Sequence, residues 1–82
     1  MPRFFFDIED VELQPDREGV ELEGLNAARI EAVRRSGQLL SDAPDRFWSV
    51  GEWKCTCRDD KGLILFVLNF YSNEAPATFG KK

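Results

Sequence analysis

Histidine is absent from this 82-residue chain. It is the only side chain whose unperturbed pKa lies near neutrality, and it is the commonest metal ligand in proteins. Its absence excludes catalytic triads built on a histidine base and leaves no histidine for a zinc site. We therefore predict that the protein is not an enzyme and that it carries no metal and no cofactor.

Cysteine is scarce, since the chain has only Cys55 and Cys57. Two residues apart on a strand, their thiols point to the same face. A structural zinc site needs four ligands and would require two chains, and a disulfide between strand positions two apart has poor geometry. A redox or metal pair is thus the lesser alternative. The favoured interpretation is two small core side chains under a helix, because free cysteine is among the most buried residue types.

Long apolar runs are also missing. No stretch approaches the roughly 20 residues that span a bilayer. The opening MPRFFFDIED lacks the apolar segment of a signal peptide. We expect a cytoplasmic protein with reduced thiols and no membrane partner.

Positive charge is in deficit, because 15 acidic and 11 basic residues give a net charge of −4. Residues 1–24 hold eight carboxylates against two arginines, a local charge of −6. Such a chain is repelled by phosphate backbones and anionic membranes. The acidic cluster could in principle hold a divalent cation, but it lacks the spacing of a calcium loop, so a solvated edge or turn is favoured. Its members are Asp7, Glu9, Asp10 and Glu12.

The residues that are present predict an α+β domain. Phe4, Phe6 and Ile8 alternate along a strand, and residues 15–19 (PDREG) have the composition of a turn, so residues 3–23 predict an antiparallel hairpin. From residue 25 the apolar period becomes that of an amphipathic helix, which Pro44 ends. Its apolar side comprises Leu25, Ala28, Ala32, Val33, Ser36, Leu39, Leu40 and Ala43.

A second hairpin follows a connection over residues 45–52. Residues 53–58 alternate, residues 59–62 (DDKG) form a turn, and residues 63–70 are almost entirely apolar. The predicted fold is ββαββ, a four-stranded antiparallel sheet with one amphipathic helix packed on one face. It forms a single domain over residues 1–71, and residues 72–82 form a flexible carboxyl-terminal tail.

The last strand is apolar on both faces, with Ile64, Phe66, Leu68 and Phe70 on one and the remaining apolar residues on the other. A one-sided antiparallel sheet would place polar residues on its wet face. Either residues 45–52, which carry Phe47 and Trp48, fold across the second face, or another chain covers it. We favour a homodimer, although another protein partner is possible. The predicted self-association surface consists of Phe5, Leu63, Leu65 and Val67.

The alternative function is binding to nucleic acid. Lys54 and Arg58 share a strand face with Thr56, and Phe5 lies on the same side of the sheet. Basic side chains interleaved with an aromatic one can hold single-stranded nucleic acid. Because the pattern has only two charges, a solvated face is favoured and nucleic-acid binding is unlikely.

Four motifs in this order resemble a family of small bacterial domains of unknown function, over about residues 1–71. They are Met1-Pro2-Arg3-Phe4-Phe5-Phe6, Asp16-x-Glu18-Gly19-x-Glu21-Leu22, Ala27-Ala28-Arg29-x-Glu31-Ala32 and Trp53-x-Cys55-x-Cys57-x-Asp59-x-x-Gly62-x-x-Leu65. Members usually have histidine where Asp7 stands and valine-type residues where Cys55 and Cys57 stand. The resemblance supports the fold and implies no activity. A weaker likeness to antitoxin domains is opposed by the absence of a DNA-binding segment after Phe70.

Overall fold

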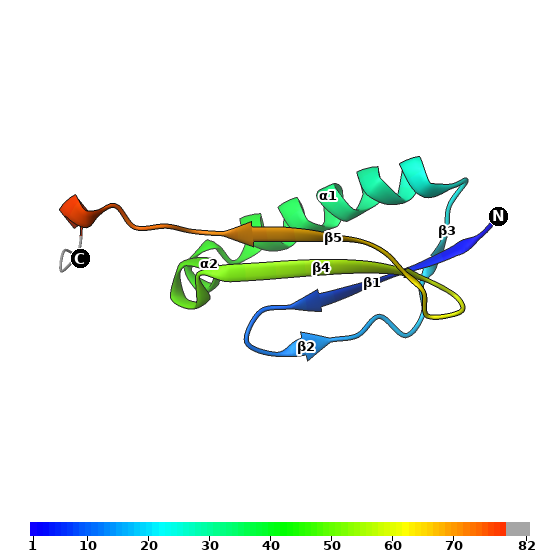
Figure 1. Cartoon of the computed structure of the whole chain (residues 1–82), viewed down its shortest axis with the longest axis horizontal. Coiled ribbons are helices and arrows are strands. Elements are labelled where there is room, and N and C mark those ends of the chain that lie inside the picture. The colour runs from blue at the N-terminus through cyan, green and yellow to red at the C-terminus, as the bar shows by residue number, and fades with distance from the viewer. Residues whose placement is uncertain (79–82) are drawn as a thin grey trace.

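A computed structural model describes residues 1–78 and confirms the α+β class. Its elements, labelled in Figure 1, are β1 (Arg3–Glu9), β2 (Leu13–Gln14), β3 (Val20–Glu21), α1 (Leu25–Asp42), α2 (Pro44–Val50), β4 (Glu52–Asp59), β5 (Ile64–Tyr71) and a 3-10 helix (Pro76–Thr78). The predicted count of four strands and one helix is wrong, because the described residues form five strands and a second α-helix.

The sheet is antiparallel throughout, in the order β2-β1-β4-β5, with β3 also paired to β1. β2 pairs with the carboxyl end of β1 and β3 with its amino end. The predicted first hairpin is therefore one long strand facing two short ones. Residues 15–19 leave the ladder between them, since proline cannot donate to it and Gly19 has a positive φ of 71°.

Helix α1 packs on one face of the sheet through its smallest side chains. Ala28, Ala32 and Ser36 are fully buried, as the helical periodicity predicts. Ala28 and Ala32 belong to the same core cluster as Phe6 and Cys57, where small residues let the helix come close to the strands. The flanks of the predicted apolar side are less covered: Leu25, Val33 and Leu39 are exposed.

The connection before β4 contains the second helix, α2, where the sequence predicted only a connection over residues 45–52. Pro44 ends α1 and then stands at the start of α2, a position that proline favours. Phe47 of α2 lines a small cavity together with Leu39 of α1 and Trp53 of β4. Helix α2 thus closes the end of the core on the α1 side (Figure 1). The suggestion that residues 45–52 cover the second face is wrong, and residues 1–78 place no helix across that face.

The second hairpin has the predicted turn. Asp59 Oδ1 accepts hydrogen bonds from the backbone N–H groups of Lys61 and Leu63, both at 2.9 Å. Gly62 has a φ of 86° and donates its N–H to the Asp59 carbonyl at 3.1 Å. After β5, Ser72 still donates its N–H to the Gly51 carbonyl at 3.0 Å. Flexibility of residues 72–82 stays a prediction, and its last part, residues 79–82, lies outside the described residues.

Candidate interaction surface

Strand β5 is the most apolar strand and the least covered. Its sequence ILFVLNFY has no charged residue, yet none of its eight residues is buried. In the neighbouring strand β4, Trp53, Cys55 and Cys57 are all buried. The buried core lies between α1 and the two central strands β1 and β4, so the sheet extends one strand beyond its cover. β5 is consequently exposed on the open face and along its outer edge.

A bulge at the start of β5 changes which of its residues share a face. Cys57 pairs with Phe66 whereas Arg58 pairs with Ile64, so Leu65 is the extra residue. Leu65 packs against the core on the α1 side. Ile64, at 60% exposure, takes the place on the open face that alternation predicted for Leu65. Strict alternation cannot anticipate such an insertion.

The predicted self-association surface of Phe5, Leu63, Leu65 and Val67 is therefore divided. Phe5 is partly buried, and the Arg58 guanidinium lies over its ring, 4.6 Å from the centroid. Leu63 is exposed in the hairpin turn, and Val67 is 41% exposed on the open face. Leu65 belongs to the other side of the sheet. Two of the four predicted residues thus remain on an accessible surface.

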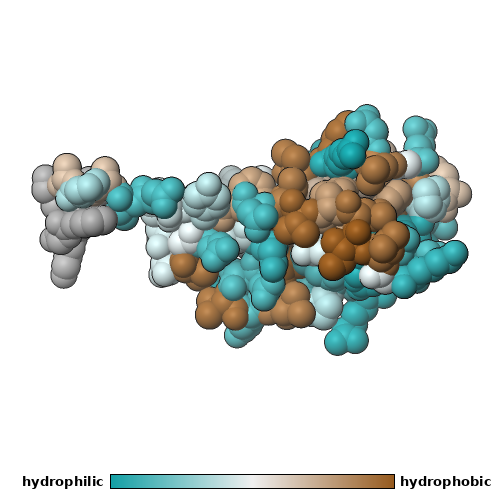
Figure 2. Space-filling view, in the orientation of Figure 1, coloured by the Kyte–Doolittle hydropathy of each residue, from teal (hydrophilic) through white to brown (hydrophobic). Residues whose placement is uncertain are grey.

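We define the β5 surface as the outer edge of β5 and the exposed side chains on its open-face side. These side chains are Leu63, Ile64, Val67, Asn69 and Tyr71. Figure 2 shows a hydrophobic area over the amino-terminal half of β5 that extends toward α1. On that helix Ile30 and Val33 are more than half exposed. A contiguous exposed apolar area of this kind marks interaction sites in soluble proteins.

The opposite edge of the sheet is closed by the chain itself. Asp16 Oδ2 accepts the backbone N–H of Phe6 at 3.1 Å, in the gap between β2 and β3. Asp16 Oδ1 accepts the N–H groups of Glu18 and Gly19 at 3.1 and 3.0 Å. A carboxylate thus replaces the missing partner strand, while acidic side chains and a proline discourage any other strand from pairing there. From the sequence alone, this motif could be recognised only as a turn.

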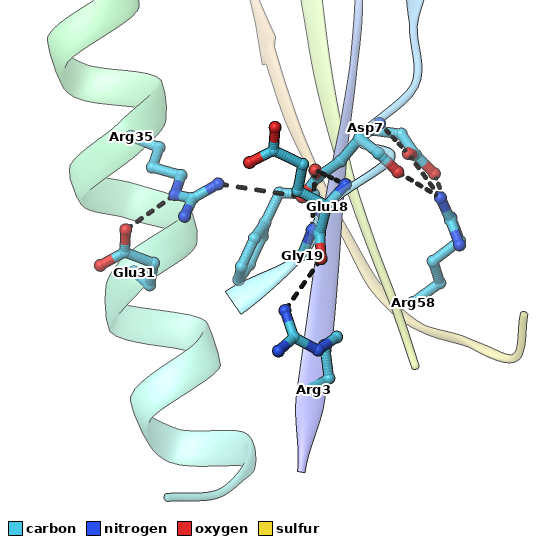
Figure 3. Close-up of polar contacts among 9 residues, drawn as sticks. Arg3, Asp7, Glu18, Gly19, Glu31, Arg35 and Arg58 are labelled. Carbon is cyan, nitrogen blue, oxygen red and sulfur yellow. Dashed lines mark hydrogen bonds and ion pairs between the residues drawn. The ribbon is translucent and has the colours of Figure 1, made fainter. Parts of the chain in front are cut away.

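Two arginines hold this loop from either side (Figure 3). Arg58 donates to Asp7 Oδ2 at 2.8 Å and to the Asp16 carbonyl at 2.7 Å. On the helix side, Arg35 lies 4.0 Å from the Asp16 carboxylate and stacks over the Phe6 ring. The residues of the loop are therefore fixed by charge-assisted hydrogen bonds, which are stronger than neutral ones.

The same contacts neutralise the predicted nucleic-acid face. Arg58 is paired with Asp7, whose hydrogen bond raises the pKa of the arginine. Lys54 lies 3.2 Å from a carboxylate oxygen of Glu9. Each cation on this strand face has an acidic partner, so the face offers phosphate groups little uncompensated positive charge.

Burial makes the two thiols poor nucleophiles. Cys55 and Cys57 are free and fully buried. Burial raises the pKa of Cys55, and it raises the pKa of Cys57 to about 11. Because the thiolate is the reactive form, neither group suits nucleophilic or redox chemistry. Among residues 1–78 no group of three or more cysteine or carboxylate side chains is arranged to bind a metal ion.

We expect both thiols to resist labelling in the folded protein. A disulfide reagent at pH 8 should modify Cys55 and Cys57 only at the rate of unfolding, whereas both should react within the mixing time in guanidinium chloride. Absorbance of the released thiolate measures the reaction. Rapid labelling of either thiol without denaturant would contradict their place in the core.

The Asp16 carboxyl should make the stability of the fold depend on pH in the acidic range. Burial alone would raise its pKa, but hydrogen bonds from Gly19, Phe6 and Glu18 and the charge of Arg35 lower it below 3.8. A carboxyl with a lowered folded-state pKa stabilises the fold above its unfolded pKa, and this contribution is lost as pH falls through the folded value. Asp10, whose pKa Arg46 lowers to about 2, acts in the same direction.

The free energy of unfolding should therefore decrease as pH falls from 5 toward 2. Asp16→Asn should be about 1–3 kcal/mol less stable at pH 7, because it loses hydrogen bonds to a charged acceptor. It should also show a shallower decrease between pH 5 and 2. Urea unfolding followed by tryptophan fluorescence measures both effects. An unchanged pH dependence in this variant would show that Asp16 does not carry the effect.

These features define a small α+β domain built around one antiparallel sheet with helices on one face. The chain belongs to DUF6894, a family of domains of unknown function, which matches residues 3–71. This match confirms the resemblance to a family of small domains of unknown function. No curated protein and no solved structure shows significant similarity to the chain. Within residues 1–78, no helix has the length and hydrophobicity needed to cross a lipid bilayer.

Proposed function

We propose that this domain is a non-catalytic interaction module that works as a homodimer joined through the β5 surface. The observation that carries the proposal is the contrast within β5: the strand has no charged residue, and none of its residues is buried. Burying its apolar side chains against a partner would contribute up to about 1.5–3 kcal/mol for each side chain fully removed from water. The proposal involves no cofactor and no chemical step.

Charge distribution supports β5 over the opposite edge as the contact between copies. Acidic residues are concentrated in residues 1–24, which form β1, β2, β3 and their loops at the far side of the sheet. β2 lies three strand spacings from β5, or about 14 Å. This exceeds the Debye length of about 8 Å at physiological ionic strength, so repulsion between two copies is weak at a β5 contact.

A cytoplasmic location belongs to the proposal because the free thiols of Cys55 and Cys57 suit a reducing compartment. Nucleic-acid binding is not proposed, since Lys54 and Arg58 both have carboxylate partners.

Sedimentation equilibrium of the wild-type chain tests the proposal. Between about 1 µM and about 1 mM, a range that covers most specific interfaces, the apparent mass should rise from 9.4 kDa to twice that value and then stop. The plateau matters because a two-fold contact closes on itself. A constant monomer mass over the whole range would refute self-association. Continued growth beyond the dimer would refute a closed contact.

A further inference from the structure

We propose that two copies pair their β5 strands antiparallel across a two-fold axis at Asn69, so that the two five-stranded sheets become one. This inference rests on the proposed function, because it specifies the geometry of the same dimer. In this arrangement Val67 lies opposite the partner's Tyr71, and Asn69 lies opposite the partner's Asn69. Three features of β5 support this arrangement: the backbone groups at its outer edge, the accessibility of that edge, and the match of side chains across the axis.

The backbone groups at the outer edge follow from the sheet register. Phe6 donates its N–H to Asp16, away from β4, so Phe6 and its register partner Cys57 form a non-hydrogen-bonded pair. Cys57 must then turn its N–H and C=O toward β5, where its partner is Phe66. Alternation along β5 points the N–H and C=O groups of Val67, Asn69 and Tyr71 outward.

A second contact agrees with this assignment. The N–H of Ser72 bonds to the Gly51 carbonyl, on the inner side of the strand. Ser72 has the same parity as Phe66, so residues 67, 69 and 71 have the opposite parity and face outward. Within residues 1–78, β5 pairs with β4 alone, and these three residues hold six backbone hydrogen-bonding groups at an unpaired edge.

The edge lacks most devices that prevent strand pairing. Residues 66–71 contain no proline, no charged residue and no inward-pointing lysine. The only irregularity is the bulge at Leu65, which lies before this segment. The opposite edge, in contrast, has short strands, a proline and the Asp16 carboxylate over the Phe6 N–H. One edge of the sheet is closed, and the other is left available.

A two-fold axis restricts the register to a few choices. Paired residues must have side chains on the same face of the joined sheet. The axis therefore has to lie midway between two copies of one residue, which pairs with itself, and it cannot lie beside a peptide bond between two residues. With Asn69 at the centre, all three outward-facing residues pair with outward-facing residues. Val67 meets the partner's Tyr71 on the open face, and Leu68 meets the partner's Phe70 on the α1 side. Apolar side chains thus face apolar ones, and the two Asn69 amides face each other.

Neighbouring registers match less well. An axis at Leu68 would put Val67 against the partner's Asn69 and would direct Tyr71 to the bulged Leu65. With the axis at Val67, the partner's Asn69 would face that same bulge. Only the Asn69 register uses every outward-facing residue of the regular strand and pairs side chains of like polarity.

Cysteine cross-linking of the full chain tests the register. Asn69→Cys should form a disulfide-linked dimer under mild oxidation, because opposite residues in a hydrogen-bonded pair have Cα atoms about 5.5 Å apart. Val67→Cys alone should not, since the two copies of this position would lie about 13 Å apart along the strands. An equimolar mixture of Val67→Cys and Tyr71→Cys should give a linked heterodimer. Val11→Cys, exposed on the opposite edge, measures linking by random collision.

The outcomes separate this inference from the proposed function. If the wild type sediments as a dimer but Asn69→Cys and the mixture link no better than Val11→Cys, the edge pairing is wrong and the homodimer stands. Efficient linking of Val67→Cys alone, or a linked heterodimer of Val67→Cys with Asn69→Cys, would place the axis elsewhere and overturn the register. A wild type that stays monomeric at every concentration would remove both proposals. Native Cys55 and Cys57 do not interfere, because both are buried on the α1 side.

Discussion

Val67→Lys is expected to raise the dissociation constant of the proposed dimer by at least about 100-fold. Val67 lies on the open face of β5, and a dimer contains it twice, so the substitution removes two apolar contacts and places two ammonium groups at the contact. A loss of about 1.4 kcal/mol per copy is within the range for part of a valine side chain and suffices for this factor. Sedimentation measures the dissociation constant.

Val11→Lys is the matched control for this variant. Val11 is 75% exposed in the loop after β1, on the edge opposite β5, and the substitution changes the net charge equally. It should leave the dissociation constant within about 2-fold of wild type, because it touches no part of the proposed contact. Equal association of Val67→Lys and Val11→Lys would show that β5 is not the contact, and circular dichroism confirms that each variant is folded.

Gly19→Ala should destabilise the fold by about 2–4 kcal/mol, the largest stability effect we expect from a single methyl group. Gly19 has a φ of 71°, which costs an L-residue about 1–2 kcal/mol. The added Cβ would also lie 2.8 Å from the Phe5 ring and 2.9 Å from the Phe4 carbonyl oxygen. The ring can move, but the carbonyl belongs to β1, so the loop that carries Asp16 must shift.

Gly62→Ala separates the cost of the positive φ from the cost of the steric clash. Gly62 has a φ of 86°, and an added Cβ would meet no atom within 4 Å. This variant should therefore lose only the backbone term of about 1–2 kcal/mol. Urea unfolding of both variants gives the comparison. If Gly19→Ala is no less stable than Gly62→Ala, the close approach of residues 16–19 to β1 does not contribute to stability.

The sequence predicted those parts of the fold that depend on local periodicity. Ala28, Ala32 and Ser36 recur at helical spacing and are buried under α1, and Cys55 and Cys57 alternate on the covered face of β4. The β4–β5 turn was also predictable, because Asp59 and Gly62 supply the hydrogen-bond acceptor and the positive φ that such a turn needs. The resemblance to a family, based on four motifs in the same order, supported the predicted fold but implied no activity.

The missed features depend on tertiary contacts or on single inserted residues. The α2 helix is seven residues long, and its apolar side chains Phe47 and Trp48 also suit an extended segment. Asp16 could be recognised as a turn residue, but its hydrogen bond to Phe6 joins residues ten apart in sequence. The bulge at Leu65 moves one side chain to the other face without any signal from composition. These misses altered the predicted surface more than the fold.

The two edges of the sheet explain why the same short chain contains a carboxylate-capped loop and an unprotected apolar strand. Along β1 the Asp16 loop supplies internally what a neighbouring strand would supply, and this edge belongs to the acidic residues 1–24. Beyond β5 the chain supplies nothing within residues 1–78. A domain of this size has one helix long enough to cover its sheet, and α1 covers β1 and β4. A second copy would then complete the edge.

Amide hydrogen exchange of Val67, Asn69 and Tyr71 reports directly whether a second strand pairs with β5. Their N–H groups point away from β4, so in a monomer they should exchange at nearly the rate of an unfolded chain. At concentrations where the proposed dimer dominates, all three should become strongly protected, while Phe66, Leu68 and Phe70 should be protected at every concentration by bonds to β4. If these three outward-facing amides still exchange at nearly the rate of an unfolded chain at about 1 mM, a concentration at which a dimer of micromolar affinity dominates, no strand pairs with β5.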